Sequence, residues 1–442
     1  CLTIAGGVIA NGGFSTSQAL TLRGHYVVSA DQSWSVAGSA AHNTDQGVVV
    51  REITTGATNR GSLTLNANLT KTGVGQVDFI AIDVTGAGNL VIDSGDLKLN
   101  AGGSQPLVVG GSGNLTMNGS SVLAVYKNSG TMNITRSIVM NDTSSLVARN
   151  STVDIASPIA FNGIHTLDAG GTTNLTGAWT GSGTVNRTGT GTLTLSGDKM
   201  LFFGTLNLGA GTTNLTGGSN FGGSLNVNGG TATMSGGMIG NALTVGTGAT
   251  FIGETPVLGD ITLNGGSFNA DPTTMGHLAT NANLTLTGTN NVVLTGIAAS
   301  NAPFTVLSYT GALTGGVANL ALVGGSANYR SPTFDDTDPG FITLSVGSES
   351  RTWTGATSTA WDVNATANWA EGDQKFLQLD AVTFGDTGAG TVAVTGTVRP
   401  SSITVDSAAN YAFTMATAND LIAGAASLTK RGSGTLTLGV DD

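Results

Sequence analysis

The chain of 442 residues is poor in cysteine, charge and aromatic side chains, and each shortage excludes a class of protein. Its single cysteine is Cys1, which excludes an intrachain disulfide framework and a cysteine-based zinc site. Cys1 is either the lipidated first residue of a lipoprotein or the point where a processed fragment begins. We favour the second interpretation, because residues 2–7 read as a strand and a turn rather than as the polar tether of a lipid anchor.

Charged residues make up only 10% of the chain, and their balance is acidic, with a net charge of −11. The 16 lysines and arginines are dispersed along the chain without a cluster, so no basic patch is available to neutralise nucleic-acid phosphates or an anionic membrane surface. We therefore expect no nucleic-acid partner. No apolar run is long enough to cross a bilayer, so we also expect no membrane span within this chain.

Aromatic residues are rare, at 5%, whereas glycine is abundant, with 68 residues. Such a composition is compatible with disorder. However, 39% of the residues are hydrophobic, and they alternate with polar residues in short segments. Because this pattern can bury a core, we reject the disordered interpretation.

A ladder of near-copies between residues 206 and 268 is the most informative feature of the sequence. Each copy has a short apolar–polar–apolar strand, a turn rich in glycine or asparagine, and small polar residues that lead into another strand. The copies begin at Leu206, Leu225, Leu243 and Ile261, which lie 19, 18 and 18 residues apart. A fixed period built of strands and turns predicts an all-β solenoid with one coil per repeat and roughly 20 coils.

The same alternation extends on both sides of this ladder. The segment Gly-Thr-Thr-Asn-Leu-Thr-Gly of residues 171–177 recurs at residues 211–217, which is a shift of 40 residues and corresponds to two coils. Further upstream, Leu90, Leu115 and Met132 begin strands that we interpret as equivalent positions of successive coils. No helical periodicity is present in the most regular part of the chain, residues 167–286.

Changes in composition divide the chain into four predicted parts. Residues 1–60 form irregular N-terminal coils or a cap, and residues 61–300 form a regular β-helix. Residues 301–347 form an aromatic and acidic β segment. Residues 348–442 form a tryptophan-rich unit that ends in a repeat and continues the β-helix.

Two segments resemble the autotransporter-associated β-strand repeat of bacterial secreted passengers. Residues 186–197 read Asn-Arg-Thr-Gly-Thr-Gly-Thr-Leu-Thr-Leu-Ser-Gly, and residues 428–438 read Leu-Thr-Lys-Arg-Gly-Ser-Gly-Thr-Leu-Thr-Leu. Residues 69–77 are a weaker copy. The segment with Trp353, Asn368-Trp369 and Phe384 is similar to the unit that often precedes this repeat in large surface proteins.

This resemblance implies a right-handed parallel β-helix, with roughly 18–25 residues per coil, on the surface of a Gram-negative-type bacterium. Such a passenger is anchored at the outer membrane or released. The family normally continues into an outer-membrane β-barrel, so we expect this barrel downstream of the chain and interpret the chain as a passenger fragment.

Candidate metal and protease residues are few. The histidines His25, His42, His165 and His277 lie far apart and lack the spacing of a metal motif, so no metal site is predicted. Residues 385–388, Gly-Asp-Thr-Gly, are the nearest match to a serine-protease nucleophile loop, but they carry threonine at the nucleophile position and are interpreted as a turn.

Acidic residues are the candidates for carbohydrate chemistry, because glycan cleavage needs clustered carboxylates. Those that could line neighbouring coils are Asp78, Asp83, Asp93 and Asp96, and the few of the regular ladder region are Glu254, Asp260 and Asp271. We favour solvated turn positions for all of them. Residues 335–340, Asp-Asp-Thr-Asp-Pro-Gly, suggest calcium, but no glutamate stands at the twelfth position of an EF-hand loop, so a side-chain-stabilised turn is favoured.

Two further patterns have a structural and a functional interpretation. Tryptophans at a spacing of eight residues are either a stacking platform for sugars or part of the core, and we favour the core. Asn-x-Thr triplets suit the edges of alternating strands better than they indicate glycosylation. The residues concerned are Trp353, Trp361 and Trp369, and Asn68, Asn114, Asn174, Asn214 and Asn283.

No catalytic, cofactor-binding or metal-binding residue is therefore predicted, and no cofactor. The sequence predicts a non-enzymatic, surface-exposed or secreted passenger stalk that acts as an adhesin. Its expected partner is a host-cell or matrix receptor, a glycan, or the same protein on a neighbouring bacterium. One alternative is a β-helix protein that binds or cleaves carbohydrate, and a second is a self-associating structural surface protein.

Overall fold

The computed structural model describes residues 2–4, 7–10, 19–38, 47–51, 60–101, 107–127, 132–150, 152–217, 220–296, 298 and 302–439. Cys1 and His42, for which the sequence offers interpretations, lie outside these residues. The chain divides into two compact units, which are described separately. Unit 1 comprises residues 1–267 and 279–287, and unit 2 comprises residues 268–278 and 288–442.

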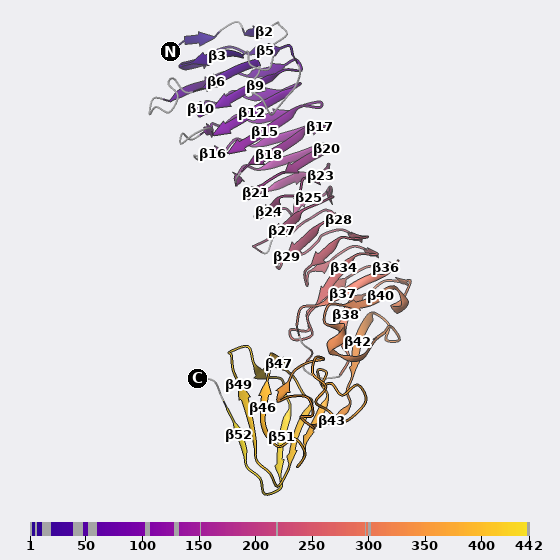
Figure 1. Ribbon diagram of the computed structural model, residues 1–442. Coiled ribbons are helices and arrows are strands. Elements are labelled where there is room, and N and C mark those ends of the chain that lie inside the picture. Colours follow the sequence, from indigo (N-terminus) through magenta and orange to yellow (C-terminus); the bar gives the residue numbers. More distant parts are fainter. Residues whose placement is uncertain are drawn as a thin grey trace. The chain divides into compact units, whose positions relative to one another are not determined.

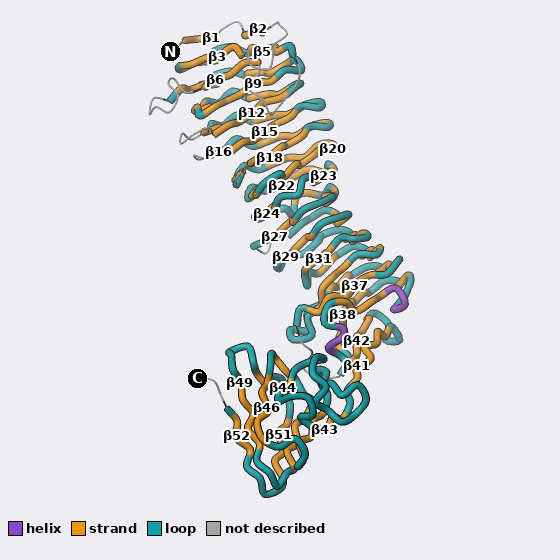
Figure 2. Tube along the Cα trace, viewed as in Figure 1, coloured by secondary structure: helices purple, strands orange, loops and turns teal. Residues whose placement is uncertain are grey.

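The protein is a parallel β-solenoid of about 17 turns, with about 21 residues per turn. Figure 1 shows the strands of successive coils stacked on one another within unit 1. Strands and turns alternate along the chain, and the described residues contain two short 3-10 helices but no α-helix (Figure 2). The predicted fold class, an all-β parallel solenoid, is confirmed, while its handedness stays a prediction.

Up to three strands form a coil of unit 1, and equivalent strands pair in parallel to form three faces; in two coils a single bridge residue, Phe221 or Ile239, stands in place of the strand of the second face. The first face consists of β1 (Leu2–Ile4), β4 (His25–Val28), β7 (Gly61–Leu65), β10 (Ile82–Thr85), β13 (Leu107–Val109) and β16 (Met132–Ile134). In later coils the corresponding strands are β19 (Val153–Ile155), β21 (Thr172–Leu175), β24 (Thr192–Leu195), β27 (Thr212–Leu215), β29 (Thr231–Met234) and β31 (Thr250–Ile252).

The second face begins with β2 (Val8–Ala10), β5 (Gln32–Val36), β8 (Leu69–Thr72), β11 (Leu90–Ile92) and β14 (Leu115–Met117). It continues with β17 (Ile138–Asp142), the first half of β20 (Ile159–Ala169), β22 (Trp179–Gly181) and β25 (Leu201–Phe202). Further along, β32 (Pro256–Val257) pairs with β35 (Leu278–Thr280).

The third face begins with β3 (Ala19–Arg23), β6 (Gly47–Arg51), β9 (Gln76–Ile80), β12 (Asp96–Ala101), β15 (Val122–Lys127) and β18 (Ser145–Asn150). After the second half of β20 it continues with β23 (Thr184–Thr188), β26 (Thr205–Leu208), β28 (Ser224–Val227), β30 (Leu243–Gly246), β33 (Ile261–Asn264) and β36 (Leu284–Thr287).

Alternate residues of each strand point into the solenoid and form its core. In β26, Leu206 and Leu208 are buried, whereas Thr205 and Asn207 are partly exposed. Strands of adjacent coils lie about 4.8 Å apart, so each inward side chain packs on its counterpart in the next coil. Burial of each such leucine, valine or isoleucine contributes about 1.5–3 kcal/mol. The alternating sequence therefore produces one continuous apolar column.

The predicted ladder is confirmed by the strand register. Leu206 pairs with Leu225, Leu225 with Leu243, and Leu243 with Ile261. The recurring segment is confirmed as well, because β21 and β27 are separated by one intervening strand, β24, and therefore by two coils.

One predicted equivalence is wrong. Leu90 pairs with Leu115 as expected, but Leu115 then pairs with Ile138. Met132 instead pairs with Leu107, on the first face. All three strands of a coil share the same apolar alternation, so spacing alone does not reveal which face a strand belongs to when coil lengths vary.

Unit 2 begins with a small region of mixed pairing. Its elements are β37 (Asn290–Leu294), β38 (Phe304–Tyr309), β39 (Leu313–Thr314), η1 (Val317–Asn319), β40 (Leu320–Val323), η2 (Ser326–Asn328), β41 (Arg330–Asp335) and β42 (Phe341–Gly347). Strand β37 pairs in parallel with β40, whereas β42 is antiparallel to both β38 and β41. The short connection at residues 336–340 reverses the chain, which permits only antiparallel pairing. β34 (Ser267–Ala270), like β35, spans a boundary of the two units.

The rest of unit 2 is a short parallel stack with three sheets. One sheet has β43 (Ser350–Thr352), β45 (Ala381–Phe384), β48 (Ser402–Asp406) and β51 (Ser427–Arg431), and a second has β44 (Ala360–Trp361), β46 (Gly390–Val394), β49 (Tyr411–Met415) and β52 (Leu436–Leu438). The third has β47 (Thr397–Val398) and β50 (Leu421–Ile422). The predicted boundaries near residues 60, 300 and 347 stay predictions.

Candidate functional site

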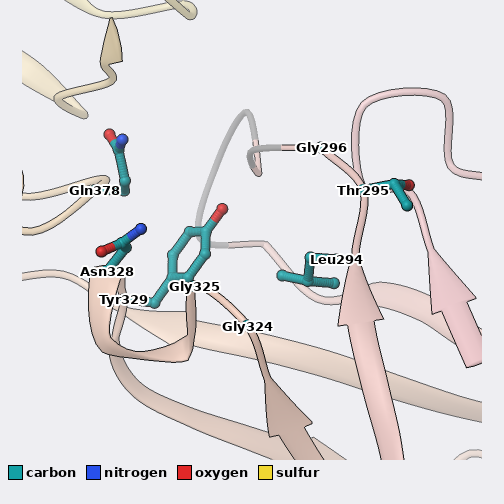
Figure 3. A pocket seen from close by; sticks show the side chains of 8 residues that line it. All are labelled: Leu294, Thr295, Gly296, Gly324, Gly325, Asn328, Tyr329 and Gln378. Atoms are coloured by element: carbon teal, nitrogen blue, oxygen red, sulfur yellow. The ribbon is translucent and has the colours of Figure 1, made fainter. Parts of the chain in front are cut away.

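A cavity of about 290 Å³ lies in unit 2, between the ends of β37 and β40 and the segment around Gln378. Its walls are Leu294, Thr295, Gly296, Gly324, Gly325, Asn328, Tyr329 and Gln378 (Figure 3). Gly324 and Gly325 follow β40 with φ angles of 63° and 73°, a left-handed conformation that favours glycine. These two residues turn the chain into η2 and so place Asn328 and Tyr329 at the cavity.

Hydrogen bonds fix the polar wall of this cavity. The Tyr329 hydroxyl accepts a hydrogen bond of 3.0 Å from the Ala298 backbone N–H, and burial raises the pKa of Tyr329 above its ordinary value of 10.0. The Gln378 amide donates to the Thr397 carbonyl at 2.9 Å and accepts from the Arg399 N–H at 2.7 Å. Because both ends of the Gln378 amide are occupied, this side chain is a rigid part of the wall.

The chemistry of the lining is neutral and polar. Tyrosine, asparagine, glutamine and threonine supply hydroxyl and amide groups, and among the described lining residues none is an acid, a histidine, a lysine or a cysteine. The lining therefore offers hydrogen-bonding groups for a small uncharged ligand but no nucleophile with an adjacent base. The sequence did not single out these residues, because Gln378 is far from Tyr329 along the chain and amide side chains occur throughout it.

A second cavity of about 260 Å³ lies beside the edge strands β51 and β52. Its lining is mostly apolar and includes Ile403, Phe413, Met415, Ile422, Leu428 and Leu438. Leu428 and Leu438 are exposed. The residues that pair with them on the neighbouring strands β48 and β49, Ile403 and Phe413, are buried.

The acidic residues at positions 78–96 do not converge on one groove. Asp83 forms an ion pair with Arg60, and Asp93 accepts a hydrogen bond from the Asn118 amide at 3.2 Å. By contrast, Asp78 and Asp96 are both buried in strands of the third face, where Asp78 lies 3.3 Å from the Lys98 ammonium group, so the interpretation as solvated turn positions is wrong for these two residues.

The acids of the regular ladder region occupy surface and turn positions. Glu254 is exposed, and Asp260 accepts a hydrogen bond of 3.0 Å from the Asn283 amide on the next coil. Asp271 accepts hydrogen bonds from the backbone N–H and the hydroxyl of Thr273, at 2.8 and 2.5 Å.

The two segments considered for calcium and for a protease form turns. Asp335 accepts hydrogen bonds from the Thr337 N–H and hydroxyl, which hold its pKa below its ordinary value. Asp386 accepts hydrogen bonds from the Ser407 hydroxyl at 2.8 Å and from the Ala408 N–H at 2.7 Å, and the first of these is the main reason why its pKa is lowered. Both carboxylates therefore stabilise local backbone.

The three described histidines lie apart from one another. Their side chains contact different serines: His25 contacts Ser62 at 3.0 Å, His165 contacts Ser144 at 3.2 Å, and His277 contacts Ser308 at 3.1 Å. His165 and Ser144 are both buried, so this pair is closed to solvent. Across the described ranges, no three histidine, cysteine, aspartate or glutamate side chains are grouped so that they could hold a metal ion.

The tryptophans are core residues of unit 2. Trp353, Trp361 and Trp369 are all buried, and the Trp353 and Trp369 rings meet edge to face at 5.2 Å between centroids. Asn368 is buried beside them, and its amide donates to the Ala360 carbonyl at 2.7 Å. The favoured interpretation as core packing is confirmed, which leaves these rings unavailable as a sugar platform.

Several of the Asn-x-Thr asparagines link neighbouring coils. The amides of Asn68, Asn174 and Asn283 donate to Asp31, Asp154 and Asp260, at 3.2, 2.7 and 3.0 Å. The Asn114 backbone N–H donates to the side chain of Asn89 at 2.9 Å. These contacts are consistent with the strand-edge interpretation.

The fold and these sites define the protein as a parallel β-solenoid. Comparison of the chain with protein-family models, curated proteins and solved structures finds no match. In the described part of the chain, no helix has the length and apolar character needed to cross a membrane.

Proposed function

We propose that this chain is the stalk of a bacterial surface passenger and that it presents an adhesive face to host cells, extracellular matrix or neighbouring bacteria. In this proposal the protein is non-enzymatic, belongs to the autotransporter type, and is anchored at the outer membrane or released from it. The repeat segments at residues 186–197 and 428–438 support this assignment by their resemblance to passenger repeats.

The observation that carries the proposal is the parallel pairing of strands from coil to coil in unit 1. The third face pairs in parallel from β3 to β36, and the first face is formed by two successive parallel sheets, one that ends at β16 and one that begins at β19. Inside, buried apolar side chains form a column. Such a solenoid resists bending, because any bend must open hydrogen bonds or apolar contacts between coils. Stiffness of this kind suits a stalk that holds a contact surface away from a cell.

The outward positions of the first face between β21 and β31 support an adhesive role. They form two columns of small, uncharged polar groups on successive strands, broken only by one isoleucine at the last strand. The columns are Thr172, Thr192, Thr212, Thr231 and Thr250, and Asn174, Thr194, Asn214, Thr233 and Ile252. A flat face that repeats the same hydroxyl and amide groups favours many weak contacts, whose avidity exceeds the affinity of any single one.

Surface display tests this function. Bacteria that carry the chain on their surface are expected to attach to host cells or matrix-coated plates, or to aggregate, more than bacteria that carry an empty display scaffold. A matched variant replaces Thr192, Thr212 and Thr231 by glutamate and is expected to reduce attachment while the purified protein stays folded. Equal attachment by chain and scaffold would contradict the proposal, as would release of products in a glycan-degradation screen.

The cavity at Tyr329 favours a second candidate, a carbohydrate-binding protein. Hydroxyl and amide groups on a rigid wall are the groups that recognise sugar hydroxyls. Immobilised glycans are expected to retain the purified protein, and Asn328→Ala is expected to lower that retention at least tenfold. The control is Asn214→Ala, because Asn214 belongs to unit 1 and does not line this cavity, and this variant should be retained as well as the native chain. Equal retention of Asn328→Ala would exclude the cavity.

A further inference from the structure

The third face of unit 1 has a buried polar patch on its outer side. Gln76 and Asp78 of β9 and Asp96 and Lys98 of β12 point outward and are nevertheless buried. Further along the same face, outward residues such as Asn207 are partly exposed. This patch therefore places a lysine amine and two carboxyl groups in a dehydrated position, outside the apolar column of the solenoid.

The strand register brings one amine and one carboxyl group together. Asp78 and Lys98 are direct neighbours on adjacent parallel strands. The Lys98 Nζ atom lies 3.3 Å from Asp78 Oδ2, and the side chains of Lys98 and Asp78 are only 6% and 0% exposed. From the next coil, the Tyr126 ring holds the Lys98 Nζ atom at 5.1 Å from its centroid. Both reacting groups are thus confined by the backbone and by packing.

Dehydration and proximity favour a reaction between these groups. Removal from water disfavours the charged forms of both, so a proton can pass from the ammonium group to the carboxylate to give a neutral amine and a neutral acid. Groups that a fold holds in contact react as if at very high concentration. In water the same groups would be ionised and separated, and would not condense.

We propose that Lys98 and Asp78 join in an amide bond that links two successive coils covalently. The Lys98 Nζ atom attacks Asp78 Cγ, a nitrogen–carbon bond forms, and the carbon–oxygen bond to the hydroxyl group breaks. The hydroxyl group leaves with one proton from Nζ as a water molecule. No oxidant, reductant or cofactor is consumed, and the net charge of the pair is unchanged.

Asp96 is the residue placed to move the protons. It lies two positions before Lys98 on β12, on the same side of the strand, and pairs in register with Gln76 of β9. Its carboxyl group is therefore diagonal to Asp78, at a separation that side chains on one sheet face can bridge. Asp96 would accept the proton that Nζ loses and deliver a proton to the departing hydroxyl group.

Mass spectrometry of the full chain tests the bond directly. The measured mass of the native protein is expected to be one water molecule below the mass calculated from its sequence. The Lys98→Arg variant is expected to have its full calculated mass. An acylated Lys98 resists trypsin, so residues 72–127 should appear as one peptide instead of 72–98 and 99–127. After a further cleavage between Asp83 and Asp96, the pieces with Asp78 and Lys98 should remain joined.

The Arg149–Asp168 ion pair is the internal control, because its partners lie on the same face at 2.5 Å but arginine does not condense in this way. Their peptides are expected to be unlinked. A native chain of full sequence mass, with separate 72–98 and 99–127 peptides, would overturn the proposal. Asp96→Asn is expected to leave a larger unlinked fraction, and complete linkage in that variant would overturn the role given to Asp96.

Discussion

Buried cations hold the corner turns of unit 1. Arg187 donates to the carbonyl of Gly189 at 2.6 Å, and Lys71 donates to the carbonyl of Gly73 at 2.5 Å. Arg136 and Lys199 likewise donate to turn carbonyls. Burial lowers the pKa of both Lys71 and Lys199 to about 8. Desolvation of each cation costs free energy, but the cation donates hydrogen bonds to buried turn carbonyls, and this offsets the cost.

Replacement of Arg187 tests this role. Arg187→Met keeps much of the side-chain volume but removes the donors, so the Gly189 carbonyl loses the Arg187 donor and the Gly191 carbonyl keeps only the Thr212 N–H. We expect the free energy of unfolding to fall by about 1–3 kcal/mol, measured by chemical denaturation. The matched control is Lys430→Met, because Lys430 occupies the same position of the repeat as Arg187 but is exposed. An equal loss of unfolding free energy in Lys430→Met would contradict the importance of burial.

His165 makes the stability of the protein depend on pH. Burial lowers its pKa below the ordinary value of 6.5, against smaller opposing effects of Ser144 and Asp142. Below pH 6.5 the unfolded chain therefore binds a proton that the folded chain does not, and stability falls as the pH falls. We expect the melting temperature to drop between about pH 7.5 and pH 5.5, and less so in His165→Gln. The exposed His25→Gln control should keep the full drop, and an unchanged drop in His165→Gln would exclude this residue as its source.

At the scale of elements, the repeat segment is a strand–turn–strand corner. In residues 186–197, Gly189 has a φ of 83°, which favours glycine, and a Cβ atom on Gly191 would lie 2.0 Å from the Gly171 carbonyl oxygen of the previous coil. The segment at residues 428–438 repeats both features: Gly432 has a φ of 69°, and a Cβ atom on Gly434 would lie 1.9 Å from a backbone oxygen. The motif thus specifies a left-handed turn residue, a close approach between coils, and a cation that binds the turn.

A single methyl group tests the close approach. Gly191→Ala is expected to lower the free energy of unfolding by about 1–3 kcal/mol, because the backbone oxygen it meets cannot move without opening the stack. Chemical denaturation measures the loss. Gly385→Ala is the control, since a Cβ atom there has open space and Gly385 has no positive φ. Equal stability of the two variants would show that the coils adjust freely.

Asparagine side chains on the third face form ladders of hydrogen bonds between coils. The Asn207 amide donates to Asn186 at 2.8 Å, and the Asn226 amide donates to Asn207 at 2.8 Å. Each asparagine thus donates to one coil and accepts from the next, which repeats in the side chains the pattern of the backbone. Such stacks are one structural role of asparagine in this chain.

At the scale of the whole molecule, the two units are stabilised in different ways. Unit 1 is stabilised by apolar side chains that stack from coil to coil and by buried cations that bind the carbonyls of its corner turns. Unit 2 has a compact aromatic core around Trp361 and Phe384, and a buried ionic network beside it. In that network Asp380 accepts hydrogen bonds from Arg330 at 2.6 and 2.8 Å and lies 3.7 Å from Arg351.

Loss of the Asp380 charge is expected to destabilise unit 2 selectively. Asp380→Asn leaves two buried guanidinium groups without their central anion, so unit 2 should lose about 3–5 kcal/mol. Hydrogen exchange measures this as reduced protection in β43 and β45 with unchanged protection in β24 and β27. Asp373→Asn is the control, because this partner of the same arginines is 45% exposed and should contribute about 0–1 kcal/mol. Equal losses in both units would contradict separate stabilisation.

Much of the fold could be predicted because the repeat is local. Leu206, Leu225, Leu243 and Ile261 lie in register as their spacing indicates. The pattern at Met132 suggests a strand equivalent to those at Leu90 and Leu115, but Met132 lies on another face, because the strands of one coil share a common pattern. The antiparallel β41–β42 pair was not predicted, since alternation does not indicate strand direction.

The amino-acid sequence by itself determined the solenoid, its period and the corner motif, because each depends on residues a few positions apart or one coil apart. Only the tertiary structure decided which residues share a site. Asn328, Tyr329 and Gln378 meet at one cavity through turns that no local pattern encodes, and Asp78 meets Lys98 only because two coils align in register. Burial decided the chemistry of that pair, and burial is a property of the packed molecule.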